Sequence, residues 1–414
     1  MVVSEARISD HRFENPLRPD DQFQDIKFET GDFDLKTLKE TVEDSALKNA
    51  HLIRNRIPQS SKSLDVTSQQ EITAQRILEL LCLRRYRRGS RTFVDENKTE
   101  HLEKIMAAVK SNRPIEIILS FFGYKVRNPL KTWAEEGSEV DLSEVASLLR
   151  FHEIAVAIQQ LYPPGAKIRV ACDGRKYAPA VGYAEDEGSK YFSNLAEVAS
   201  FLGINNTVDL FEESDFYPHD IQQKRAEHIG RIKTQYESGC PETASLIDQL
   251  KCSLALTIPV ANRTSLQILH LAFCSTLSDQ ELRSLNPEAY DVRRWLCDES
   301  VETAIRYIGS YNAVKEAGVL ETVGHLALRG TVHPKPGQIG LYAVNEGSNN
   351  IFPHHGQGVA KGFNASIELD EVRVKFRADL ERCSQASSLR GIVLPPEKYP
   401  FSNGKHPFTF VQQN

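Results

Sequence analysis

Two short apolar segments on either side of a well-bounded helix constrain the fold of this 414-residue chain more than any other feature. Residues 115–125 (IEIILSFFGYK) are rich in Ile and Phe, and residues 167–174 (KIRVACDG) end in an Asp-Gly turn. Between them, residues 141–161 carry apolar side chains at helical spacing, start with the capping pair Asp141 and Glu144, and stop at YPPG, which cannot continue a helix. This strand–helix–strand pattern predicts two parallel strands whose carboxyl ends, SFFGYK and CDGR, meet at one edge of a sheet.

The rest of the chain completes a prediction of the α/β class. Residues 1–67 are polar and end in the loop-like PQSSKSLD, so we predict an N-terminal extension there, packed on the body or partly mobile, and a main domain over 68–414. Residues 190–320 show mainly helical periodicity. Strand-like alternation returns at 326–333, 338–344, 365–369 and 372–376. We therefore expect a Rossmann-like core sheet with flanking helices, a smaller appended α+β region and the N-terminal extension.

Two helices are expected around the start of the main domain. One lies near residues 35–53, within the extension. Its apolar face would consist of Leu38, Val42, Leu47 and Ile53. The other lies near residues 68–85, where Ser68 and Glu71 have the S-x-x-E form of a capping box.

Composition and charge narrow the function classes. The chain carries 50 Lys and Arg against 56 Asp and Glu, a formal net charge of −6, which argues against a general nucleic-acid binder. No stretch approaches the roughly 18 to 20 uninterrupted apolar residues that span a bilayer, and the first residues do not have the pattern of a secretory signal. Seven scattered cysteines without a C-x-x-C pair indicate reduced thiols. We expect a cytoplasmic globular protein with no nucleic-acid or membrane partner.

Polar residues gather where the first apolar segment ends. Three cations and an amide lie within seven residues: Lys125, Arg127, Asn128 and Lys131. Arg and Lys bind phosphate or carboxylate groups, and a desolvated lysine can transfer protons. The segment therefore predicts a site for an anionic substrate, the alternative being a solvated basic loop.

A carboxylate follows the second apolar segment. Asp173 stands on a glycine turn at the end of the predicted strand, close to Arg175. Such a carboxylate can accept hydrogen bonds from a sugar hydroxyl or an amine, although Asp-Gly is also an ordinary turn pair. Its position after a strand, more than the string DGR, makes Asp173 a candidate site residue.

A third polar segment reads RGTVHPKPGQ. Strand alternation would place Arg329, Thr331 and His333 on one face, where burying three polar groups is costly without a partner. His333 is a candidate general acid or base near neutral pH, the alternative being a histidine satisfied within a polar strand end. Lys335 and Gln338 belong to the same segment.

Two adjacent histidines, His354 and His355, lie in the fourth segment, PHHG. Together with His333 they raise the question of a metal site. No H-E-x-x-H or similar spacing is present, and adjacent residues on an extended chain point to opposite sides, so we expect a site without metal. The chain also has no G-x-G-x-x-G or P-loop motif in the right context, which leaves nucleotide binding unsupported.

Taken in order, these segments resemble the pyoverdine/dityrosine biosynthesis family of isonitrile synthases. The resemblance rests on K-x-x-N-P-x-K, YPPGAKIRVACDGR, R-x-T-x-H-P-K-P-G-Q and PHHG-x-G-V. It covers Ile72 to the end of the chain and is strongest over 115–360. The chain departs from the family at Gly330, where a hydrophobic residue is frequent, and at Lys176-Tyr177, where a Val/Ile-Phe pair is common.

The resemblance implies a Rossmann-like α/β core and a reaction without a metal or redox cofactor. It implies that the α-amine of an amino acid, typically Tyr or Trp, becomes an isonitrile whose terminal carbon comes from ribulose 5-phosphate. The implied route is imine formation, base-assisted enolisation, phosphate loss and carbon–carbon cleavage. An iron/2-oxoglutarate oxygenase would be a downstream partner.

Residue roles follow from the same resemblance. It implies proton transfer and catalysis by Lys125, Asp173 and His333. It implies contacts with the substrate phosphate, carboxylate or amine by a larger set: Arg127, Asn128, Lys131, Arg175, Arg329, Thr331, Lys335, Gln338, His354 and His355. Two alternatives stay open, an enzyme of the dityrosine type that forms an N-formyl amino acid, and a non-catalytic sugar-phosphate-binding protein of the same fold.

Overall fold

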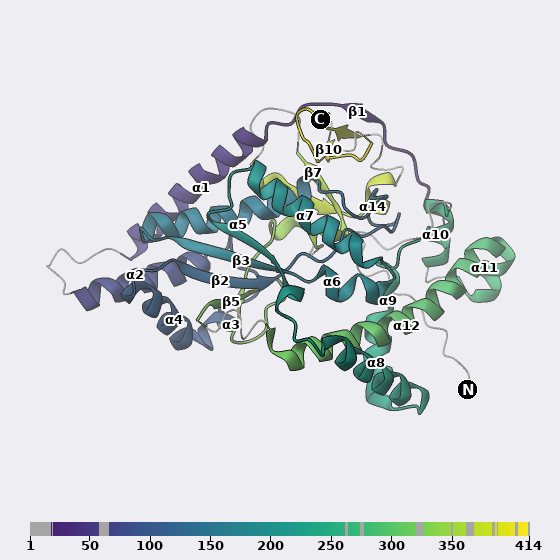
Figure 1. Ribbon diagram of the computed structural model, residues 1–414. Coiled ribbons are helices and arrows are strands. Elements are labelled where there is room, and N and C mark those ends of the chain that lie inside the picture. Colours follow the sequence, from purple (N-terminus) through teal and green to yellow (C-terminus); the bar gives the residue numbers. More distant parts are fainter. Residues whose placement is uncertain are drawn as a thin grey trace.

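Two five-stranded sheets organise the part of the chain that the computed structural model describes (Figure 1). That part comprises residues 18, 20–57, 66–260, 264–273, 277–319, 326–348, 351–361, 368–382, 386, 388–401 and 405–412. No helix within these ranges is long and apolar enough to cross a membrane. Helices flank a parallel sheet, which confirms the predicted α/β class.

The first sheet is parallel throughout and contains both strands predicted from the apolar segments. Across the sheet its strands are β4 (Val208–Glu212), β3 (Ala166–Cys172), β2 (Ile115–Ser120), β5 (Leu328–Thr331) and β6 (Ile339–Gly340). Ser120 on β2 lies opposite Ala171 on β3, and Ile118 on β2 lies opposite Arg329 on β5. The chain runs from β2 through β3 to β4 and then returns to β5 on the other side of β2. The carboxyl ends of β2 and β5 therefore form a topological switch point, where open α/β sheets bind ligands.

Helix α5 (Leu142–Leu161) joins β2 to β3 and lies between the two sheets, in contact with β3 and with β7 (Gln357–Ala360) of the second sheet. Asp141 and Glu144 form the predicted capping box, and the helix ends at Tyr162, directly before the two prolines. Most of its residues are buried, which is typical of a helix that is covered on all sides. This helix is the centre of the molecule.

The second sheet is mixed. Its strands, in order, are β1 (Phe28–Thr30), β9 (Leu389–Val393), β10 (Thr409–Gln412), β7 (Gln357–Ala360) and β8 (Arg373–Lys375). β1 pairs parallel to β9 and β10 parallel to β7, whereas the other two pairs are antiparallel. The sheet thus joins a strand of the predicted N-terminal extension to the last quarter of the chain.

Further helices surround the sheets, and the segment predicted as mainly helical is so. These helices are α2 (Val66–Leu81), α3 (Arg91–Asp95), α4 (Lys98–Lys110), α6 (Gly174–Tyr177), α7 (Glu185–Phe201), α8 (Ile221–Glu237), α9 (Pro241–Ala255), α10 (Leu266–Phe273), α11 (Asp279–Leu285), α12 (Pro287–Ala317) and α14 (Arg377–Glu381). Short 3₁₀ turns are η1 (Pro179–Val181), η2 (Glu213–Phe216), η3 (Glu346–Ser348), η4 (Pro353–His355) and η5 (Leu369–Glu371). Figure 1 shows α8 and α12 side by side, on the opposite side of the molecule from α1 (Leu35–Arg56) and α2.

Two local predictions need correction. Helix α2 is already helical at Val66, so Ser68 lies inside the helix and the S-x-x-E pattern is not its cap. The alternation at 365–369 does not give a strand at its described end, because Leu369 starts η5, and 362–367 lie outside the described residues. A short pattern of polar and apolar residues is too common to fix an element without its neighbours.

The described part of the predicted N-terminal extension packs into the body. Helix α1 (Leu35–Arg56) lies along α5. Its buried face consists of Leu35, Leu38, Val42, Ala46, Ala50 and Ile53. Leu47 was expected on this face but is 47% exposed, because five residues rotate a helix by about 500° and carry Leu47 away from Val42. The boundary between an extension and a main domain at residue 67 stays a prediction.

Replacing Leu38 by Ala tests whether α1 is part of the core. Leu38 is 2% exposed, so its truncation is expected to lower the free energy of unfolding by about 2–5 kcal/mol, measured by chemical denaturation. Leu47→Ala on the exposed side of the same helix is the matched control and is expected to change stability little. Equal effects of the two substitutions would contradict this assignment of the buried face.

Candidate active site

The four polar segments predicted from the sequence come together at the carboxyl edge of the first sheet. The chain leaves β2 at Ser120, β3 at Cys172 and β5 at Thr331, and these parallel strands end on the same side. The fourth segment joins them through a hydrogen bond from the Val126 N–H to the carbonyl oxygen of His354, at 3.0 Å. The predicted meeting of SFFGYK and CDGR at one sheet edge is confirmed.

Glycines at the two strand ends allow a close backbone approach. The N–H of Asp173 donates to the carbonyl oxygen of Phe122 at 2.9 Å. A Cβ atom on Gly174 would lie 2.3 Å from the carbonyl oxygen of Gly123, a distance no side chain can adopt. Gly174 is therefore needed for the packing of the β3 end against the β2 end, as well as for the turn.

Asp173 is the carboxyl group at the centre of this edge. The hydroxyl of Ser120 donates to its Oδ2 at 3.2 Å. A Cβ atom on Gly123 would lie 3.1 Å from Asp173 Oδ1 and 3.8 Å from His354 Nε2, so this carboxyl and this imidazole face the same small space. Burial raises the pKa of Asp173 to about 7, against the nearby ammonium of Lys176. A carboxyl with that pKa can accept and return a proton near neutral pH.

Three imidazoles surround Phe352. The ring of His354 stacks on Phe352 with a centroid distance of 5.3 Å, and His333 meets the same phenyl ring edge-on at 4.9 Å. Residues 353–355 form the turn η4 rather than extended chain, so the rings of His354 and His355 lie only 4.4 Å apart. Among the described residues, no group of three or more His, Cys, Asp or Glu side chains is arranged to hold a metal ion.

The two ends of this imidazole cluster differ in exposure. His354 is buried, and burial together with the Lys125 and Lys131 ammonium groups lowers its pKa to about 3, which keeps the ring neutral at physiological pH. His333 is exposed. It was predicted on one strand face with Arg329 and Thr331, but β5 ends at Thr331, whose hydroxyl oxygen accepts the His333 N–H at 3.1 Å. The chain turns there, and His333 leaves the strand.

Lys125 is enclosed by oxygen atoms. Its Nζ lies 2.8 Å from Asp141 Oδ2 and 2.7 Å from Glu144 Oε1, and it also donates to the carbonyl oxygens of Pro353 and Gly356 at 3.4 and 3.2 Å. All three ionisable side chains are buried. The two carboxylates raise the pKa of Lys125 despite its burial, so the amine stays protonated. We call this group, Lys125 with Asp141 and Glu144, the Lys125 junction.

The pKa values of the two carboxyl groups of the Lys125 junction are shifted in opposite directions. Although both are buried, the Lys125 ammonium holds the pKa of Asp141 well below its usual range. Burial and the adjacent Asp141 charge raise the pKa of Glu144, which also accepts a hydrogen bond from the Tyr191 hydroxyl at 3.1 Å. Both groups belong to the α5 capping box, where the helix dipole favours negative charge.

The other predicted residues of the first segment contact protein groups around their own loop. Arg127 pairs with Glu187 at 3.0 Å, and its guanidinium lies over the Tyr183 ring. Asn128 is buried, and its Oδ1 accepts the N–H of Leu130 at 3.0 Å. The buried ammonium of Lys131 lies 5.5 Å from the Phe376 ring centroid. These side chains lie around the loop, and their predicted contacts with a substrate stay predictions.

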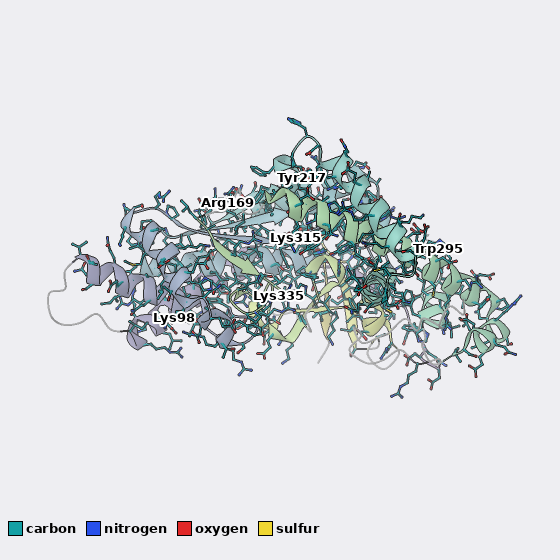
Figure 2. The ribbon with its side chains drawn as sticks, turned by 90° about the horizontal axis from the view of Figure 1, so that it is seen from below. Lys98, Arg169, Tyr217, Trp295, Lys315 and Lys335 are labelled. Atoms are coloured by element: carbon teal, nitrogen blue, oxygen red, sulfur yellow. The ribbon has the colours of Figure 1, made fainter. Side chains whose placement is uncertain are left out.

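The remaining predicted residues lie after β3 or on and after β5. Arg175 pairs with Glu212 at 3.1 Å and donates to Ser189. Arg329 is half-buried on β5. Lys335 is exposed, and its backbone N–H donates to Gln338 Oε1 at 3.1 Å. Figure 2 labels Lys335 on the face of the molecule that is seen from below.

Sequence reasoning missed two parts of this site. It identified Asp141 and Glu144 as a helix cap and not as partners of Lys125, because nothing local links residues 16 and 19 positions apart. It also named Lys176 only as a departure from the family pattern and passed over Glu213, although both side chains are buried and act on Asp173. Glu213 directly follows β4, so the rule applied to the other strand ends, a polar residue after an apolar run, would have found it.

Comparison with known proteins gives a family and a fold. A family model described as pyoverdine/dityrosine biosynthesis protein matches residues 105–336, more than half of the chain. The crystal structure of the PvcA protein from Pseudomonas aeruginosa superposes with a TM-score of 0.57 at 20% identity, over 82% of this chain and 99% of that one. The structural match supports the α/β fold described above.

Curated relatives match over shorter ranges. L-tyrosine isonitrile synthase of Xenorhabdus nematophila is 34% identical over 160 residues, which are 36% of this chain and 47% of the relative. L-tryptophan isonitrile synthase AmbI2 of Fischerella ambigua is 30% identical over 117 residues, 28% of this chain and 34% of the relative. The chain thus matches less than half the length of each of these two enzymes.

Replacing Lys125 by Met tests the Lys125 junction. Removing the cation leaves the buried Asp141 carboxylate without its nearest counter-charge, so the free energy of unfolding is expected to fall by about 3–5 kcal/mol at neutral pH. The depressed pKa of Asp141 stabilises the wild type above the unfolded-state pKa near 3.8, and this contribution is lost as the pH falls through the folded value. The deficit of Lys125→Met should therefore shrink below about pH 4, as measured by denaturation at several pH values.

The control for this prediction is Lys190→Met. Lys190 forms an exposed pair with Asp186 at 3.0 Å, so removing it is expected to change stability little at any pH. A Lys125→Met protein as stable as the wild type at neutral pH would show that the Lys125 junction does not hold the loops together.

Proposed function

Because this chain belongs to the pyoverdine/dityrosine biosynthesis family, we propose that it is an isonitrile synthase. It would convert the α-amino group of an amino acid to an isonitrile, as a carbon–carbon lyase without a metal or redox cofactor. The observation that carries the proposal is a carboxyl with a pKa of about 7, Asp173, facing the neutral imidazole of His354 beside the topological switch point. The names of the matched relatives support the same reaction.

The proposed substrates are an amino acid of the Tyr or Trp type and ribulose 5-phosphate. The relatives are named for L-tyrosine and L-tryptophan. Aromatic rings line the proposed site on the β2 side. The ring centroid of Tyr124 lies 6.5 Å from that of His354 and 6.3 Å from that of His355. The Phe352 ring packs against both imidazoles. The product would pass to an oxidising enzyme such as an iron/2-oxoglutarate oxygenase.

In the proposed reaction the amine condenses with the sugar ketone and releases water, which gives an imine. A base then removes a proton from the carbon next to the imine, and phosphate is lost. Cleavage of both carbon–carbon bonds of the former ketone carbon leaves that one carbon on the nitrogen, and the other four sugar carbons depart. Asp173 is suited to that base, since its carboxylate and carboxylic acid forms coexist near pH 7. His333 would act as the second acid or base, and His354 as a neutral hydrogen-bonding group.

Lys125 has a positioning role in this proposal rather than the catalytic role expected from the sequence. Its ammonium is protonated and bonded to oxygens of Asp141, Glu144, Pro353 and Gly356. A protonated, enclosed amine is a poor base or nucleophile. It would instead hold the loop after β2 against the turn that carries His354.

Anion binding is proposed on the β5 side of the site. Arg127 and Arg175 are each engaged by a carboxylate, Glu187 and Glu212, and would have to exchange partners to bind a substrate anion. Lys335 is exposed two residues from His333. The phosphate or the carboxylate of a substrate would therefore bind near Lys335.

A labelling experiment tests the function. Purified protein is incubated with uniformly ¹³C-labelled ribulose 5-phosphate and a pool of the twenty amino acids, and products are identified by mass spectrometry. One amino acid is expected to gain a single labelled carbon as an isonitrile. A labelled N-formyl amino acid as the direct product would favour the dityrosine-type alternative. Sugar-phosphate binding without any labelled amino-acid product would overturn the enzyme proposal.

Replacing His333 by Ala tests the acid–base assignment. A well-placed general acid or base contributes on the order of 10²–10⁴-fold in rate, and kcat for isonitrile formation is expected to fall by about that factor. His51→Ala, an exposed histidine on α1, is the control and should leave kcat unchanged. A His333→Ala enzyme with wild-type kcat and an unchanged pH profile would remove His333 from the mechanism.

A further inference from the structure

A buried lysine and a buried glutamate follow the same pair of strand ends as Asp173, where Cys172 on β3 lies opposite Glu212 on β4. Both lie outside the four segments singled out from the sequence. Lys176 lies in α6, and its backbone N–H donates to the carbonyl oxygen of Asp173 at 3.0 Å. Glu213 starts η2, directly after the end of β4. The Nζ of Lys176 and Oε2 of Glu213 are 3.5 Å apart, although the residues are only 7% and 1% exposed.

The packing around this ion pair is not that of a strong structural salt bridge. The Lys176 ammonium lies 4.5 Å from the Tyr177 ring centroid and 5.7 Å from that of Tyr311. Glu213 Oε2 accepts one further hydrogen bond, from the hydroxyl of Tyr217, at 3.5 Å. Burying two charges is costly, and a buried pair with long contacts is weak support for stability. Its place beside Asp173 indicates a different role.

We propose that Lys176 and Glu213 are positioning residues that act on the protonation state of Asp173 with opposite sign. The proposal rests on the proposed function, in which Asp173 moves a proton. The Lys176 cation favours the carboxylate form of Asp173, whereas the Glu213 anion favours the protonated form, and both act through the low-dielectric interior. Burial raises the pKa of Asp173 to about 7, and the opposite effects of the two charges keep the pKa from moving further in either direction.

Other groups that face Asp173 carry no charge near neutral pH. They are Ser120 on β2, Tyr124 after β2, Cys172 on β3, Tyr177 on α6, Tyr217 after η2 and His354 in η4. The pKa values of the tyrosines and of Cys172 are raised by burial, and that of His354 is lowered to about 3. The guanidinium of Arg175 is paired with the Glu212 carboxylate. Among the described residues, Lys176 and Glu213 are the charged groups that act on Asp173 most strongly.

Two single variants and their combination test the proposal. Lys176→Met removes the cation and is expected to raise the pKa of Asp173 by about one unit, while Glu213→Gln removes the anion and lowers it by about as much. The double variant Lys176→Met/Glu213→Gln should return it close to the wild-type value, because both effects are removed together. Lys167→Met is the matched control, since Lys167 also lies 3.5 Å from a carboxylate, Asp209, but at the amino end of β3 and β4.

Two readouts are measured for each variant. The first is carboxyl ¹³C NMR titration of aspartate-labelled protein, with the Asp173 signal assigned from Asp173→Asn. The second is the pH dependence of kcat/KM for isonitrile formation, whose acidic limb should move to higher pH in Lys176→Met and to lower pH in Glu213→Gln. Thermal melts identify any variant that does not fold. The double variant has no unpaired buried charge. If one single variant fails to fold, the proposal is tested on the double variant and the other single variant.

The two readouts separate this inference from the proposed function. Opposite NMR shifts in a protein that forms no isonitrile would support the pair's effect on Asp173 and overturn the proposed reaction. Isonitrile formation with an Asp173 titration that is unchanged, or moves in the same direction in both single variants, would overturn the inference alone. A shift in Lys167→Met as large as in Lys176→Met would also overturn it, because the effect would not depend on the site.

Discussion

The Lys125 junction is the interaction on which the candidate site depends. One buried ammonium binds the two capping carboxylates of α5 and two carbonyl oxygens of the turn around His354. It therefore fixes three separate parts of the chain at one point: the loop after β2, the start of the central helix and the turn before β7. A neutral side chain at position 125 would leave the Asp141 carboxylate without its nearest counter-charge.

Burial at this edge acts on acids and bases in opposite directions. It raises the pKa of Asp173 to about 7 and lowers that of His354 to about 3, because a low-dielectric environment disfavours either charged form. The edge thus holds a carboxyl that can exchange a proton near pH 7 beside an imidazole that stays neutral. Exposed His333 keeps access to solvent. Groups with such different protonation behaviour in one place are what acid–base chemistry on a single substrate requires.

The architecture explains why the site forms where it does. Parallel strands end on one side, and the reversal of chain order between β2 and β5 leaves space there for the segments that follow them. The turn that carries His354 directly precedes β7 of the second sheet, and α1 packs along α5. Residues from early and late parts of the chain thereby support a site whose predicted residues all lie between Lys125 and His355.

The sequence by itself determined the strand–helix–strand unit, the Asp141/Glu144 cap, the helical middle and the gathering of polar segments at one sheet edge, since these follow from local periodicity and strand direction. It did not determine the partners of Lys125, the exposure of Leu47, the turn that takes His333 off its strand, or the Lys176–Glu213 pair beside Asp173. Those features depend on contacts between residues far apart in the chain and on burial. Only the tertiary structure sets them, because the charge a group carries is decided by what surrounds it.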